Sequence, residues 1–160
     1  MHAVLEEAAR TYADAPALHQ PIGGGKYHIY SWREYQRAAE EIACGLRRLG
    51  VRKGDVVALH AETRAEFYLA DLGILANGSI AAAMYTTYPM QDQVGNLRAC
   101  DARAVFVEDA KTLQGFIAAA GEPGLPVQWI LLTGEAEGAL TLEQLRAEGR
   151  ALLAEDSRAF

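Results

Sequence analysis

The chain has 160 residues, of which 51% are apolar and 22% are charged, and its formal net charge is -6. These values are typical of one soluble globular domain, because a chain of this length buries roughly 70% of its unfolded surface. The basic residues are dispersed, apart from Arg47, Arg48, Arg52 and Lys53 at the expected end of a helix. Phosphate binding needs clustered cations, so the sequence argues against a nucleic-acid partner.

The sequence also lacks the features of secretion or membrane insertion. Glu6 and Glu7 lie near the N-terminus, where a signal peptide would carry an apolar core. The most apolar region, 69–84, is interrupted by polar residues and is shorter than the ~20 apolar residues that a transmembrane helix needs. Cys44 and Cys100 are far apart, without metal-ligand or redox spacing. We therefore expect a cytoplasmic protein with two core thiols and no transmembrane segment.

Helical and extended patterns alternate along the chain. In chain order we expect a helix at 4–12, strands at 17–19 and 27–30, a helix at 31–50, a strand at 56–60, a helix at 63–76, a strand at 80–84, a helix at 91–99, a strand at 104–107, a helix at 110–120, a strand at 127–132 and a helix at 141–154. Such alternation predicts a single α/β domain over residues 1–160, doubly wound, with a mostly parallel sheet and helices on both faces.

Three of these helices begin with a capping-box pattern, a Ser or Thr followed three residues later by Glu or Gln. The pairs are Ser31 with Glu34, Thr63 with Glu66, and Thr141 with Gln144. In a capping box the two side chains satisfy free backbone N–H groups of the first turn. The pattern therefore predicts where each helix begins.

The run from Gly23 to Lys26 has the composition of a phosphate-binding loop but not its spacing. A Walker loop needs a Gly where this chain has Gln20 and a Ser or Thr where it has Tyr27. We expect a hairpin turn instead. The string GxGxxG of dinucleotide-binding domains does not occur, which removes the motif for a dehydrogenase.

Two loops follow predicted strands, at the sheet edge where open α/β sheets bind ligands. In the loop from His60 to Arg64, the guanidinium of Arg64 is a candidate anion ligand, although a helix cap explains most of the pattern. In the loop from Tyr85 to Pro89, two aromatic rings and two hydroxyls are candidates for the wall of an acyl or CoA channel. A turn before a helix is the simpler interpretation there.

Catalysis by this chain alone is not expected. Its four histidines lie near no recognisable nucleophile, and none has metal-ligand spacing. Adjacent acidic pairs such as Glu40 and Glu41 are expected on solvated helix faces. We therefore predict no catalytic, cofactor-binding or metal-binding residue within the chain.

Three blocks carry a resemblance to a known family. They are YSWREY at 30–35, ADLGILANGSIAAAMYTT at 70–87 and DARAVFVED at 101–109. In this order they resemble the N-terminal segment of long-chain and very-long-chain fatty acid-CoA ligases, members of the adenylate-forming (AMP-binding) superfamily. The resemblance implies the first subdomain of such an enzyme, with the remainder of the synthetase chain as its partner.

In the family, a carboxylate attacks ATP to give an acyl-adenylate, and CoA then displaces AMP. The resemblance implies ATP, Mg²⁺, CoA and a fatty acid substrate for a full-length parent. The family's phosphate loop, of the type YTSGTTGxPKG, and its later catalytic residues have no counterpart here. We expect this segment to be inactive by itself and to form a homodimer through exposed apolar surface, including the small residues at 80–84.

Two alternatives remain open. One is a stand-alone α/β binding or interaction module. The other is the N-terminal piece of another adenylating enzyme, such as an aryl-CoA ligase, a luciferase-like enzyme or a peptide-synthetase adenylation domain. The coding sequence beyond Phe160 distinguishes them, because a TSGTTG-like string supports a synthetase and an immediate native stop codon supports the module.

Overall fold

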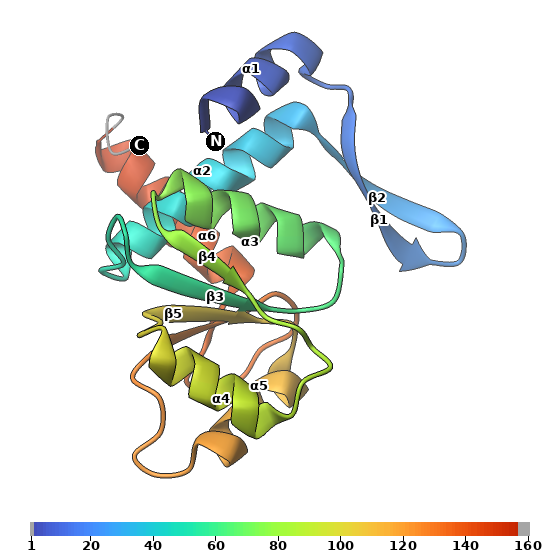
Figure 1. The fold of residues 1–160 in the computed structure, drawn as a ribbon. Coiled ribbons are helices and arrows are strands. Elements are labelled where there is room, and N and C mark those ends of the chain that lie inside the picture. The colour runs from blue at the N-terminus through green and yellow to red at the C-terminus, as the bar shows by residue number, and fades with distance from the viewer. Residues whose placement is uncertain (1, 157–160) are drawn as a thin grey trace.

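The structure, a computed structural model, describes residues 2–156 and consists of a five-stranded sheet between helices and a separate hairpin (Figure 1). Its helices are α1 (His2–Tyr12), α2 (Trp32–Arg48), α3 (Ala65–Ala76), α4 (Met90–Ala99), α5 (Ala110–Ala120) and α6 (Leu142–Glu155). Its strands are β1 (Pro16–Gly23), β2 (Lys26–Ser31), β3 (Val56–His60), β4 (Ile80–Ala83), β5 (Ala104–Val107), β6 (Gln128–Leu131) and β7 (Leu140–Thr141). The predicted doubly wound α/β fold is confirmed.

The five strands of the main sheet are all parallel and have the order β4-β3-β5-β6-β7. Val57 of β3 lies opposite Ala81 of β4 and Ala104 of β5, so β3 is a central strand. The three strands predicted to share a sheet, β3, β5 and β6, do so. The short strand β7, which pairs with Ile130 and Leu131, was not predicted, because two residues carry no periodicity.

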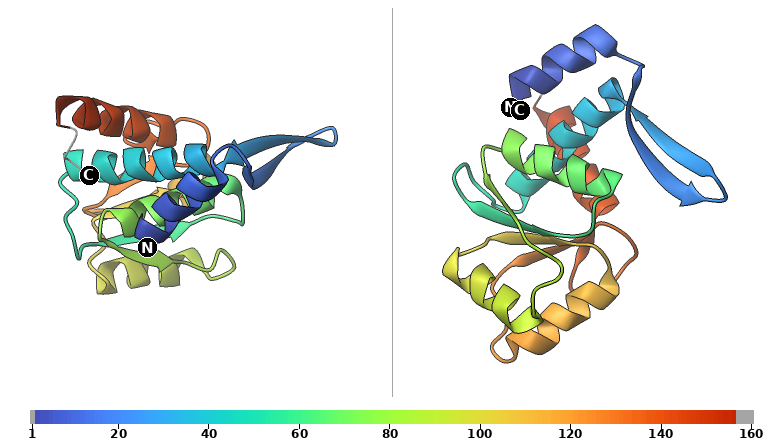
Figure 2. Two further views of the ribbon diagram at one scale, coloured as in Figure 1. Left: turned by 90° about the horizontal axis from the view of Figure 1, so that it is seen from above. Right: turned by 45° about the vertical axis from the view of Figure 1, so that its right-hand side comes forward.

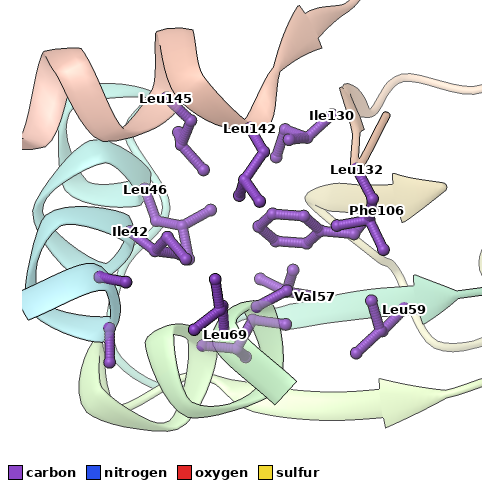
Figure 3. Packing of buried hydrophobic residues seen from close by; sticks show 14 of the residues in the cluster. Ile42, Leu46, Val57, Leu59, Leu69, Phe106, Ile130, Leu132, Leu142 and Leu145 are labelled. Carbon is purple, nitrogen blue, oxygen red and sulfur yellow. The ribbon is translucent and has the colours of Figure 1, made fainter. Parts of the chain in front are cut away.

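Successive strand residues point to opposite faces of the sheet, and this alternation divides the core into two layers. On one face, Val57, Leu59 and Phe106 pack under α2, α3 and α6 (Figure 3). On the other, Val105 and Val107 pack under α4 and α5. Figure 1 shows the two groups of helices on opposite sides of the sheet, as predicted.

Helices α2 and α6 approach each other closely because two glycines lie at their interface. A Cβ atom on Gly149 would lie 1.8 Å from the carbonyl oxygen of Glu41, and one on Gly45 would lie 2.3 Å from that of Leu145. No side chain fits at these distances. The interface therefore requires glycine at both positions, although neither has a positive φ.

The carboxylate of Glu41 is buried in the same interface, so the prediction of a solvated face for Glu40 and Glu41 is wrong at Glu41, whose exposure is 1%. Its oxygens accept hydrogen bonds from Arg37 on α2, at 2.9 Å, and from Arg146 and Arg150 on α6, at 2.8 and 3.2 Å. Three guanidinium groups thus compensate the buried charge and join the two helices.

Strands β1 and β2 form an antiparallel hairpin that projects from the body of the molecule (Figures 1 and 2). Its tip is Gly23-Gly24-Gly25, and all three glycines have positive φ, which confirms the predicted turn. Leu18 and Tyr30 pack against the main core at the base. At the base of the hairpin, Ser31 and Glu34 form the predicted capping box of α2. The capping box predicted for Thr141 and Gln144 forms at the start of α6.

Cys44 is buried, as expected of a core thiol, whereas Cys100 is half-buried at the end of α4. None of the helices described in residues 2–156 is both long and apolar enough to cross a membrane.

Candidate functional site

The carboxyl ends of β3 and β5 lie side by side at the point where the strand order reverses, with β4 added on one side of this pair and β6 on the other. The chain leaves β3 through α3, on one face, to reach the outer strand β4, and it leaves β5 through α5, on the other face, to reach β6. The two connections diverge, and ligands of open α/β sheets bind in the crevice formed there. Both loops singled out in the sequence, 60–64 and 85–89, lie at this edge.

Glu108, directly after β5, connects the loops around this crevice. Its carboxylate accepts hydrogen bonds from the backbone N–H of Glu62, at 2.9 Å, and from Arg64 Nη1, at 3.3 Å. Its carbonyl oxygen accepts from the hydroxyl and the backbone N–H of Thr133, after β6. Sequence reasoning did not single out Glu108, although its position after a fully buried strand was a usable signal.

Helix α3 begins differently from the prediction. The prediction of a capping box at Thr63 and Glu66 is wrong, because the N-cap residue is Arg64, whose side chain makes no capping hydrogen bond. The backbone N–H of Ala65 instead donates to Oε1 of Gln20 in the hairpin, at 2.7 Å. A residue 45 positions away supplies this cap, which no local pattern reveals.

The guanidinium of Arg64 is occupied by carboxylates. Arg64 Nε donates to Glu66 at 2.8 Å and Nη1 to Glu108, and these hydrogen bonds, the one from Glu66 above all, raise the pKa of Arg64. Two negative charges already compensate this cation. Arg64 therefore acts as a structural bridge rather than as an open anion ligand.

A buried polar pair lies beneath the loop after β4. Nε2 of Gln93, on α4, lies 3.0 Å from Nε2 of His60 and donates to the carbonyl oxygens of Tyr85, at 3.1 Å, and Tyr88, at 3.2 Å. Burial lowers the pKa of His60, whose ring contacts Phe116 edge-on. Gln93 was not predicted, since one glutamine in a helical pattern is more often exposed.

The side chains of this loop line two hollows, one on each side of β4. Tyr85 and Tyr88 are 72% and 53% exposed, with ring centroids 5.5 Å apart. They border a cavity of about 400 Å³, whose floor includes Met84 and Leu97. Thr86, whose hydroxyl donates to Glu62, borders a second hollow of about 360 Å³.

The arrangement suits binding of an apolar or aromatic group better than catalysis. The cavity volume is within the range of small-molecule sites, and its lining combines aliphatic and aromatic side chains with a few polar groups. Within residues 2–156 no group of three or more His, Cys, Asp or Glu side chains is placed to hold a metal ion.

Comparison with known proteins identifies the family to which this chain belongs. Residues 5–155 match the family described as AMP-binding enzyme, and the chain belongs to that family.

Two curated relatives illustrate the similarity. The Uncharacterized protein Rv1549 of Mycobacterium tuberculosis is 31% identical over 118 residues, which cover 74% of this chain and 63% of that protein. The long-chain-fatty-acid–CoA ligase ACSBG2 of Xenopus laevis is 28% identical over 114 residues, covering 71% of this chain and 15% of that enzyme. The chain thus spans about six tenths of the first relative and a much smaller part of the ligase.

Among solved structures, the anthranilate CoA ligase AuaEII, in complex with anthranoyl-AMP, superposes with a TM-score of 0.80 at 26% identity. The match covers 91% of this chain and 27% of that enzyme. The fold is therefore that of the N-terminal part of adenylate-forming CoA ligases. The relatives include enzymes named for fatty acids and for aryl acids.

Proposed function

We propose that this chain is the opening α/β part of an ATP-dependent long-chain fatty acid-CoA ligase, and that it is inactive alone. The match of residues 5–155 to the AMP-binding enzymes carries this proposal. The similarity to ACSBG2 and the blocks at 30–35, 70–87 and 101–109 support the long-chain substrate. The likeness to the anthranilate ligase AuaEII keeps an aryl acid as the second candidate.

In this proposal the remainder of the synthetase supplies the groups that hold ATP and Mg²⁺. The edge bearing the 60–64 and 85–89 loops contributes a wall for the acyl group or for CoA. The apolar cavity beside Tyr85 and Tyr88 supports this role. The spaced, unpaired cysteines support a cytoplasmic location.

Inactivity is tested by pyrophosphate release from ATP, Mg²⁺, CoA and palmitate. We expect no release above a protein-free control, because positioned electrostatic groups are usually the largest catalytic contribution and the family's YTSGTTGxPKG-type phosphate loop has no counterpart in the sequence. Release from a preparation free of longer ligases would refute this part of the proposal. Sequencing beyond the codon for Phe160 tests the parent, since a TSGTTG-like string supports a ligase and an immediate native stop codon supports a stand-alone module.

The acyl group is tested by NMR titration of the labelled chain with palmitoyl-CoA and anthraniloyl-CoA. We expect palmitoyl-CoA to shift the amide signals of 85–89 at lower concentration, and Tyr88→Ala to weaken that response. Tyr12→Ala is the matched control, because Tyr12 is similarly exposed, at 57%, but lies on α1. A preference for anthraniloyl-CoA would favour the aryl alternative, and shifts confined to other regions would exclude this wall.

We also propose that the isolated chain forms a homodimer. Ile80 on the unpaired edge of β4 and Ile22 on the hairpin are 55% and 62% exposed, and open strand edges favour association. Light scattering across a concentration series should show a mass rising toward twice 17.3 kDa. A constant monomer mass would remove this part of the proposal.

A further inference from the structure

The loop at 85–89 is tied to the body of the protein by the amide of one buried side chain. Gln93 Nε2 lies within 3.2 Å of three acceptor atoms: Nε2 of His60 and the carbonyl oxygens of Tyr85 and Tyr88. Gln93 is 1% exposed and His60 is 5% exposed, so solvent has little access to these bonds. The amide of Gln93 therefore holds the loop through the backbone carbonyls of Tyr85 and Tyr88.

The contacts of Gln93 define the protonation state of His60 that fits the structure. A side-chain NH₂ group only donates hydrogen bonds, and its two carbonyl partners fix its orientation. Nε2 of His60 can then only accept, sharing one of the two amide hydrogens with a carbonyl oxygen, which places the proton of the neutral ring on Nδ1. Nδ1 has no hydrogen-bond partner among the described residues. Neutral His60 is thus the form compatible with the closed loop.

We propose that Gln93 is the positioning residue of the 85–89 loop and that protonation of His60 releases it. A protonated ring presents an N–H group at Nε2, directly toward the hydrogens of the amide. Rotation of the amide relieves this contact by turning Oε1 toward His60. The carbonyl oxygens of Tyr85 and Tyr88 then lose their donor, and the wall of the 400 Å³ cavity is no longer fixed.

The surroundings of His60 support release at low pH. Burial is the largest influence and lowers the pKa of His60, whereas the contact of the ring with its own backbone and then the carboxylates of Glu108 and Glu62 raise it less. Gln93 of α4 and Phe116 of α5 both contact the ring, and neither side chain titrates. Opening the loop hydrates His60 and restores its pKa toward 6.5, so the open form binds protons more strongly and gains population as the pH falls.

The experiment measures hydrogen exchange of individual amides by NMR, corrected for the intrinsic pH dependence of exchange. The reporter is the Tyr88 N–H, bonded within the loop to the carbonyl of Tyr85, and the internal reference is the Met84 N–H, bonded to Leu59 of β3. Between pH 7.5 and 5.5 we expect protection of Tyr88 to fall while that of Met84 stays constant. The expected loss over this range is at most about tenfold, because the pKa of the hydrated His60 ring is near 6.5 and the pH falls only about one unit below it.

Three variants distinguish release of the loop by Gln93 and His60, which we call the clamp, from general unfolding. His60→Phe keeps an aromatic ring beside Phe116 but does not titrate, so Tyr88 should be protected at both pH values. Gln93→Leu should leave Tyr88 unprotected at both. His28→Phe, on the exposed hairpin, is the matched control and should behave as the wild type.

Constant protection of Tyr88 in the wild type, or a pH response that persists in His60→Phe, would overturn the proposal. If His60→Phe does not fold, a pH response that persists in Gln93→Leu has the same meaning. The role of this clamp in ligand access rests on the proposed function, but these measurements involve no ligase chemistry. If these measurements contradict the role of Gln93 and His60, the ligase assignment still stands. If the ligase assignment is contradicted, the role of Gln93 and His60 still stands.

Discussion

Replacement of Gly149 by alanine should weaken the protein at the interface of α2 and α6. The new Cβ would lie 1.8 Å from the carbonyl oxygen and 2.6 Å from the carbonyl carbon of Glu41, where ordinary contacts begin near 3.4 Å. Both clashing atoms belong to the α2 backbone, so rotation of a side chain does not relieve them. The helices must separate by roughly 1.5 Å, which loosens the packing of Leu145, a fully buried side chain at this interface.

Overpacking of this kind costs about 3 kcal/mol, at the upper end of the usual range because the backbone must move. The better helix propensity of alanine returns about 1 kcal/mol. We therefore expect a net loss of about 2 kcal/mol in the free energy of unfolding, measured by urea denaturation followed by circular dichroism.

Gly95→Ala is the matched control for this substitution. Gly95 lies inside α4 and has no atom within 4 Å of the position of a new Cβ. Propensity alone should act there and stabilise the protein by about 1 kcal/mol. Wild-type stability in Gly149→Ala, or equal losses in both variants, would refute the close-contact argument.

Glu41→Gln should lower the free energy of unfolding by about 2 kcal/mol, because the three arginines around this buried carboxylate lose a charged acceptor; an unchanged urea midpoint would contradict it. Gln20→Ala should cost about 1 kcal/mol by leaving the Ala65 N–H uncapped, and hydrogen exchange at Ala65 should accelerate; unaltered exchange would exclude this cap. Ser31→Ala should cost about 1 kcal/mol at pH 7 in thermal or urea unfolding. The Ser31 backbone N–H, above all, and the Ser31 hydroxyl donate to the carboxylate of Glu34 and lower its pKa. Ser31→Ala removes only the hydroxyl, so the part of its cost that depends on this carboxylate should be complete above pH 4.5 and decline as the pH falls through the lowered pKa; a pH-independent loss would argue against it.

The main elements of the fold could be predicted because local sequence determines them. Strands at 56–60 and 104–107 are short apolar runs between capped helices, and the caps at Ser31 and Thr141 are local patterns. The glycine turn at 23–25 needs backbone angles that favour glycine. Each of these signals lies within a few residues of the structure that it predicts.

The remaining features depend on residues far apart in the chain. The cap of Ala65 comes from Gln20, and the burial of Glu41 depends on two arginines more than 100 residues later. The candidate site was predicted as two separate loops, and the amide of Gln93 that joins one of them to His60 was missed. Side-chain contacts of this kind become visible only when the topology brings strand ends together.

The interface of α2 and α6 also sets the order in which the molecule is completed during synthesis. Arg146 follows Glu41 by 105 residues, so the inner face of α2 has no partner from α6 until that length of chain has been made. At typical rates of 5 to 20 residues per second, this interval is about 5 to 20 s. During this interval α2 exposes the carboxylate of Glu41 and the bare backbone at Gly45. Each newly made copy of the protein therefore exposes this face of α2 to chaperones near the ribosome until α6 covers it.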